Sequence, residues 1–92
     1  MFSLIVCTVD RFDQLERLFR SLAGQSHKDF EVIVVDQNVD DRLRALIDGF
    51  SSSFLIRHIR SPKGLSRARN NGMAVAEGDY VLVHYLFNVP GT

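Results

Sequence analysis

Short apolar runs that alternate with segments of helical spacing constrain this sequence more than any other feature. Ser3–Val9 (SLIVCTV) and Phe30–Asp36 (FEVIVVD) are rich in β-branched residues, which is typical of strands that are buried on both faces. Phe54–Ile59 (FLIRHI) reads as a weaker, half-exposed strand, and Asp79–His84 (DYVLVH) as a fourth strand. The sequence therefore predicts four strands.

The segments between these runs have the spacing of amphipathic helices. Apolar residues recur at helical intervals over residues 12–22 and 43–50, and a third helix is expected over 65–77. Asp10 is predicted to cap the first helix, and Asn38–Asp41 to supply a turn and a cap before the second. Strand and helix alternate with short connections, which implies right-handed crossovers. The predicted fold class is α/β, a three-layer α/β/α domain with a mostly parallel sheet.

Length and composition limit the range of functions. With 92 residues the chain has room for one small domain, and 46% hydrophobic residues favour a packed core over disorder. Eleven basic and eleven acidic residues balance, so no basic excess points to nucleic acid. A single cysteine, Cys7, in an apolar run predicts a buried thiol and a cytoplasmic location. No apolar stretch is long enough to cross a bilayer.

Ligands of open parallel sheets bind at the carboxyl ends of the strands. Here Thr8–Arg11, Asp36–Asn38 and Ser61–Asn70 follow three of the predicted strands. In the third segment, Gly64 permits close approach to the backbone, and a helix start favours an anion. Lys63, Arg67 and Arg69 add positive charge there, so the segment suits a diphosphate. A solvated basic helix start after a turn explains the same residues equally well.

Asp36 and Gln37 stand where the second strand ends. A carboxylate there can accept hydrogen bonds from a ribose or a base, although Asp also caps turns in this way. Gln37 offers a donor and an acceptor to a nucleobase, or is a polar loop residue. No G-x-G-x-x-G follows the first strand, and no Walker loop or G-x-S-x-G is present. The histidines, at 27, 58 and 84, lack the spacing of a metal cluster.

Three stretches together resemble family 2 glycosyltransferases of the GT-A type. They are SLIVCTVDR, FEVIVVDQN and KGLSRARNNGMAVAEGDYVL, and the similarity runs from about Ser3 to Leu82. GLSRARNNG followed by AEGDY is the most specific part. The resemblance implies a Rossmann-like sheet with strand order 3-2-1-4. It also implies binding of a nucleoside-diphosphate sugar and, in the intact family, transfer of the sugar to an acceptor with inversion.

The resemblance also assigns residues to the nucleotide. Thr8, Asp10 and Arg11 match a segment that packs along it, and the positions of Asp36 and Gln37 face its base and ribose. The arginine of the A-R-N motif and the loop before it approach the nucleotide. The predicted nucleotide-binding residues are therefore Thr8, Asp10, Arg11, Asp36, Gln37, Lys63, Gly64 and Arg69.

The sequence departs from the family after the fourth strand. There the family has an acidic cluster that holds Mg²⁺ or Mn²⁺ against the diphosphate. Here Val83–Asn88 reads VHYLFN, and no carboxylate lies between Asp79 and Thr92, although VPGT again resembles the family. His84 and Asn88 would make a poor Mg²⁺ site. We therefore expect no metal and no catalytic residue in this chain.

These departures predict that residues 1–92 form a truncated glycosyltransferase-like domain, incomplete or inactive in transfer. The alternative is a non-catalytic module that binds a nucleotide or a partner chain. A receiver-like domain is disfavoured, because the first strand is followed only by Asp10 and the third by Arg60 and Ser61. An uncovered edge of the sheet also predicts self-association.

Overall fold

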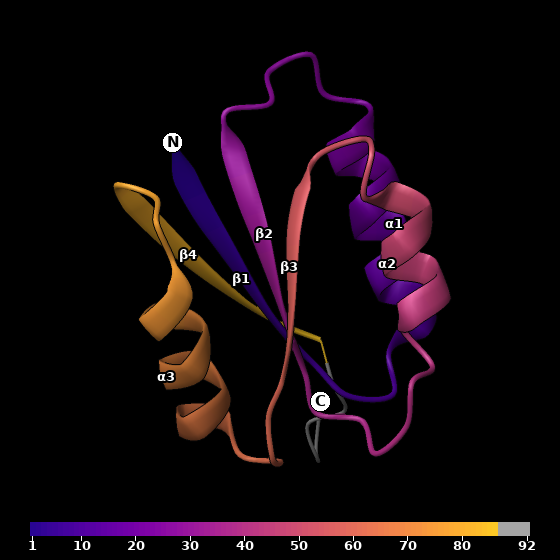
Figure 1. Ribbon diagram of the computed structural model, residues 1–92, viewed down its shortest axis with the longest axis vertical. Helices are drawn as coiled ribbons and strands as arrows, with labels where there is room; N and C mark the ends of the chain where they lie inside the picture. Colours follow the sequence, from indigo (N-terminus) through magenta and orange to yellow (C-terminus); the bar gives the residue numbers. More distant parts are fainter. Residues whose placement is uncertain (87–92) are drawn as a thin grey trace.

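The computed structural model describes residues 1–86, apart from the side chain of Leu65, and forms one four-stranded sheet with three helices (Figure 1). The strands run in parallel in the order β3-β2-β1-β4, which confirms the predicted fold class and strand order. The strands are β1 (Phe2–Thr8), β2 (Phe30–Asp36), β3 (Leu55–Arg60) and β4 (Tyr80–Leu86). The helices are α1 (Phe12–Ala23), α2 (Arg44–Phe50) and α3 (Leu65–Val75).

The register of the strands brings their ends level. Thr8 of β1 pairs with Asp36 of β2 on one side and with Leu86 of β4 on the other, and Asp36 pairs with Arg60 of β3. We call this row of strand ends the carboxyl edge and the opposite end of the sheet, where Phe2 lies between Phe30 and Tyr80, the amino edge. All four strands point the same way, so the loops after β1, β2 and β3 meet at the carboxyl edge.

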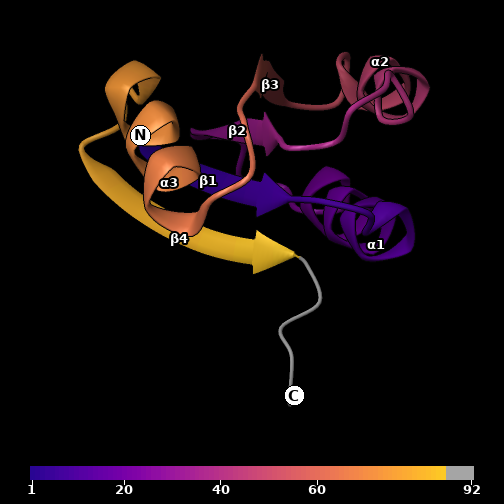
Figure 2. The ribbon, with the colours of Figure 1, turned by 90° about the horizontal axis from the view of Figure 1, so that it is seen from below.

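Two separate cores hold the helices to the sheet. Figures 1 and 2 show α1 and α2 on one face and α3 on the other. Side chains alternate along a strand, so Val6 of β1 packs under α1 and α2, while Ile5 and Cys7 pack towards α3. The core between α3 and the sheet is thin because the helix lies very close to the strands. A Cβ added at Gly72 would stand 2.5 Å from Cγ2 of Ile5.

A buried carboxylate, Glu31, connects several segments of the chain at the amino edge. Glu31 is fully buried, and its Oε2 accepts hydrogen bonds from Ser3 Oγ and from the backbone N–H of Glu77, both at 2.6 Å. Arg57 Nε lies 3.1 Å from the other oxygen, Oε1. Burial acts to raise the pKa of Glu31, but these hydrogen bonds and the charge of Arg57 outweigh it, so the pKa is lowered. Ser3 Oγ also accepts the N–H of Gly78 at 2.8 Å.

Several predicted boundaries were wrong. Asp10 does not cap α1: the N-cap residue is Arg11, and Asp10 has a φ of +54°. Leu43 precedes α2 without a side-chain cap, so the cap expected from 38–41 is absent. Helix α3 ends at Val75 rather than at Glu77. Strand β4 continues two residues beyond His84 because Leu86 still accepts the N–H of Val9, at 3.1 Å.

Strand β4 forms one edge of the sheet and is largely exposed. Tyr80 is 76% and Leu82 is 57% exposed. Such an edge is open to pairing with another chain, and self-association stays a prediction. Phe87, Asn88 and the VPGT segment lie outside the described residues. None of the helices in the described part is both long and apolar enough to cross a membrane.

Candidate functional site

The predicted site residues come from three loops that meet at the carboxyl edge (Figure 1). The loop after β1 carries Asp10 and Arg11, the end of β2 leads into Gln37, and the loop after β3 leads through Lys63 and Gly64 into α3. Lys63 and Arg69 are exposed to solvent. Arg69 lies one turn into α3, where its charge opposes the rise that burial causes in the pKa of Cys7. The topology thus brings the eight predicted residues to one end of the domain.

Asp36 is buried and already has partners for both of its oxygens. Oδ1 accepts the backbone N–H of Asn38 at 2.9 Å and the Nδ2 of Asn38 at 2.8 Å. Oδ2 lies 2.8 Å from Nε2 of His58 and 3.9 Å from Nη1 of Arg60. The contact with the N–H of Asn38 is the turn-capping role that the sequence left open. His58 is the hydrogen-bond partner of Oδ2 among the described residues.

Gln37 and Gly64 are bonded to each other. The side chain of Gln37 is buried, and its Oε1 accepts the backbone N–H of Gly64 at 3.0 Å. Gly64 is the N-cap residue of α3 and has a φ of +143°, a conformation that requires glycine. The end of β2 therefore supplies an acceptor for the N–H of the N-cap residue, although the first turn of α3 has no side-chain cap. This contact fixes the start of α3 against the end of β2.

Thr8 adds a buried hydroxyl to the same edge. Its side chain is fully buried, and its Oγ1 has no hydrogen-bond partner among the described residues. It lies in the row between Asp36 and Leu86. A buried polar atom without a partner costs free energy, and a hydrogen bond with a ligand or a water molecule would offset that cost.

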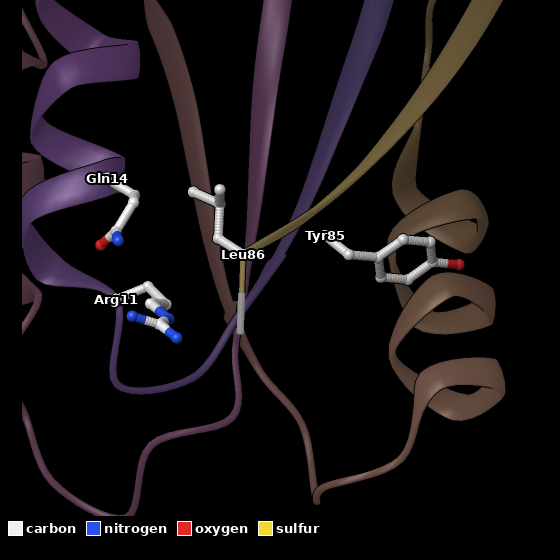
Figure 3. Close-up of a pocket in the computed structure, with 4 residues that line it drawn as sticks. All are labelled: Arg11, Gln14, Tyr85 and Leu86. Carbon is white, nitrogen blue, oxygen red and sulfur yellow. The ribbon is translucent and has the colours of Figure 1, made fainter. Parts of the chain in front are cut away.

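An open pocket of about 230 Å³ lies beside this row. It is lined by Arg11, Gln14, Tyr85 and Leu86, and Figure 3 shows it between the start of α1 and the end of β4. Leu86 points towards α1, whereas Tyr85 points towards α3 (Figure 3). Sequence reasoning identified Arg11 but missed Gln14, although Gln14 stands three residues later on the same helix face.

Charged side chains tie the loops of the carboxyl edge together. Arg42 forms ion pairs with Asp10 and, at 2.8 Å, with Asp40. The guanidinium of Arg42 lowers the pKa of Asp40 to about 2. Arg60 donates to Asp41 at 2.9 Å and to the carbonyl oxygen of Asn38 at 3.1 Å. These arginines were missed at the sequence level because they lie outside the motifs.

The described residues do not fit a divalent metal. No three of the His, Cys, Asp and Glu side chains between residues 1 and 86 gather to hold an ion. The acids at the carboxyl edge are engaged by arginine, histidine or amide side chains, as Asp36 is by His58 and Asn38. At the end of β4, Tyr85 and Leu86 stand where the family resemblance predicts carboxylate ligands.

Comparisons with known proteins identify glycosyltransferases as similar to this chain. The family model "Glycosyl transferase family 2" matches residues 3–84. A cholesterol galactosyltransferase of Borreliella burgdorferi is 28% identical over 82 residues, which is 87% of this chain and 23% of that protein. A GalNAc(5)-diNAcBac-PP-undecaprenol beta-1,3-glucosyltransferase of Campylobacter jejuni is 31% identical over 85 residues, which is 86% of this chain and 27% of that protein.

A solved structure agrees with the sequence relatives. The crystal structure of S. aureus TarS 1-349 superposes with a TM-score of 0.81 at 28% identity, covering 91% of this chain and 26% of that one. The chain thus spans about a quarter of the length of the curated relatives and of this solved structure.

Proposed function

Because the chain belongs to glycosyltransferase family 2, we propose that its carboxyl edge binds the nucleoside diphosphate part of a nucleotide sugar. The observation that carries the proposal is the meeting of two loops at Gln37 and Gly64, which sets a buried acid, Asp36, beside a helix start with exposed cations. The residues proposed to bind are those predicted from the sequence.

The two parts of a nucleotide fit different parts of this edge. The pocket at Arg11 and the unpartnered hydroxyl of Thr8 suit a base or a ribose. Both of these are rings that carry polar groups on their periphery. An N–H or O–H of the ligand replaces His58 as the donor to Asp36. The diphosphate lies at the start of α3, where the helix dipole and the charges of Lys63 and Arg69 favour an anion.

The reaction is proposed for the whole protein rather than for this segment. It transfers the sugar from the nucleotide to an acceptor hydroxyl with inversion, which requires a general base at that hydroxyl. The Campylobacter jejuni relative is named for an undecaprenol-linked acceptor, so we propose an acceptor of the cell envelope or of polysaccharide synthesis. Residues 1–92 form the nucleotide-sugar-binding part of that enzyme.

The charge of the leaving diphosphate has to be offset by positive charge. Mg²⁺ or Mn²⁺ commonly offsets the charge of the leaving diphosphate in the family, but the described residues do not fit such an ion. The cations Lys63, Arg67 and Arg69 can offset part of that charge directly. The lack of carboxylates at the end of β4 favours the second candidate, a non-catalytic nucleotide-binding module. The release of nucleotide from sugar nucleotides above the uncatalysed rate, lowered by Arg69→Ala, would decide for an enzyme.

Binding is tested by titrating the protein with UDP and with dTDP while its amide NMR shifts are recorded. We expect shifts at Thr8, Asp36 and Gly64 at millimolar ligand, without added metal. Uridine is the matched ligand without phosphates, and it should shift Thr8 and Asp36 but not Gly64. If neither diphosphate moves these amides at millimolar concentration, the proposed function is wrong.

A further inference from the structure

Asn38 contacts residues of three neighbouring strands or the loops that follow them. It comes two residues after Asp36 and is 7% exposed. Its Oδ1 accepts the backbone N–H of Asp10 at 2.9 Å, and its Nδ2 donates to Oδ1 of Asp36 at 2.8 Å. Its carbonyl oxygen accepts Nη2 of Arg60 at 3.1 Å. The side chain of Asn38 thus links the loop after β1 to Asp36.

Only a carboxamide satisfies these contacts. The carboxylate of Asp36 needs a donor and the N–H of Asp10 needs an acceptor, so the two partners also fix which way the amide of Asn38 is turned. Aspartate at this position keeps the acceptor but places a second carboxylate against Asp36. Alanine keeps neither contact.

The bond to Asp10 has a consequence for the pocket. Asp10 has a φ of +54°, which a non-glycine residue adopts at a cost, and the bond from its N–H to Asn38 holds it there. The next residue is Arg11, the N-cap residue of α1 and a wall of the pocket. Through Asp10, Asn38 sets where Arg11 stands.

We propose that Asn38 is a positioning residue: it orients the carboxylate of Asp36 and fixes the loop that carries Arg11, so that both face one nucleoside. The inference rests on the proposed function for its ligand, but its geometric part is independent of it. Asn38 itself does not touch the nucleotide. It acts on affinity through its two neighbours.

The test compares Asn38→Ala and Asn38→Asp with Ser3→Ala. Ser3 is the matched control because it is also buried, also donates to a buried carboxylate (Glu31) and also accepts a backbone N–H (Gly78), but at the amino edge. We expect both Asn38 variants to bind UDP about tenfold more weakly, as loss of a hydrogen bond to a charged group implies. Ser3→Ala should lose comparable stability and bind UDP like the unchanged protein.

Amide hydrogen exchange without ligand separates this inference from the proposed function. The N–H of Asp10 should exchange slowly in the unchanged protein and in Asn38→Asp, which keeps the acceptor, and fast in Asn38→Ala. If UDP fails to bind the unchanged protein but this exchange pattern holds, the function is wrong and the positioning of the loop stands. Fast exchange at Asp10 in the unchanged protein, or UDP affinity unaffected in both Asn38 variants, overturns the inference.

Discussion

The two ends of β2 carry the same chemical group in matching surroundings. Glu31 and Asp36 are both fully buried, and each receives a hydrogen bond from a buried polar side chain, Ser3 or Asn38. Each also faces an arginine of β3: Arg57 Nε lies 3.1 Å from Oε1 of Glu31, and Arg60 Nη1 lies 3.9 Å from Oδ2 of Asp36. Burial and partners alone therefore do not distinguish a functional carboxylate from a structural one.

What differs is the backbone around each group. At the amino edge a Cβ added to Gly78 would stand 2.6 Å from the backbone N of Ser3. The backbone segments beside Glu31 therefore pack closely against each other. At the carboxyl edge the partners of Asp36 come from a loop and from a half-buried histidine, His58, and an open pocket lies nearby. The comparison indicates that the amino edge holds the sheet together and the carboxyl edge is left for a ligand.

Removing Glu31 should have the largest effect on stability. Glu31→Ala leaves the buried hydroxyl of Ser3 and the N–H of Glu77 without an acceptor, and we expect the free energy of unfolding to fall by about 2–4 kcal/mol. Urea unfolding measures this change. UDP affinity of the folded protein should stay the same, and a loss of affinity at equal folded fraction would break the distinction between the two ends.

Changing Asp36 should instead act on the ligand. Asp36→Asn keeps the shape but removes the charge and one acceptor, so we expect UDP affinity to fall at least tenfold, about 1.4 kcal/mol. The free energy of unfolding should change by about 1 kcal/mol, because the partner histidine is half-buried and can turn to water. The NMR titration measures affinity, with Glu31→Gln as the equivalent change at the amino edge. Equal affinity losses in the two variants would contradict the assignment.

Acid should weaken the amino edge. The pKa of Glu31 is lower in the folded protein than its ordinary value of about 4.3, so its contribution to stability is complete above that value. The contribution is lost as pH falls through the lowered pKa, and the loss should be smaller than that caused by Glu31→Ala, since a protonated carboxyl still accepts. Urea unfolding at a series of pH values checks it. Glu31→Gln should remove this part of the acid dependence, and an unchanged pH profile in that variant would refute the prediction.

The strands could be predicted because buried strands consist largely of apolar residues. Val32–Val35 is a continuous apolar run, and the structure buries it on both faces between two helical layers. The direction of the strands then determined that the loops after Thr8 and Asp36 would meet, since parallel strands end at the same edge. This much of the candidate site follows from topology.

The contacts within the site could not be predicted in the same way. Asp10 looked like a helix cap, but it pairs with Arg42, 32 residues later, and its N–H is taken by Asn38. Such pairs depend on loop conformation and on which way a side chain turns, and no periodicity in the sequence records either. Glu31 was read as part of an apolar run, although an acid inside a buried strand is itself a signal that a partner must exist.

The smallest expected effect concerns the exposed cations. Arg69→Ala should weaken UDP binding about two- to fivefold, because a solvent-exposed charge near a phosphate contributes little in water and less at high salt. The free energy of unfolding should not change.

Lys28 is the matched exposed cation away from the carboxyl edge. It lies at the C-terminal end of α1, where its Nζ donates to the carbonyl oxygens of Leu22 and Ala23 at 2.9 and 2.8 Å. Lys28→Ala should cost about 0.5 kcal/mol of stability and leave UDP affinity unchanged. Titrations of both variants at two salt concentrations would test the comparison at its weakest point. If the affinity lost in Arg69→Ala does not shrink as salt rises, Arg69 contacts the nucleotide by something other than its charge, and the carboxyl edge is then not the electrostatic anion site described above.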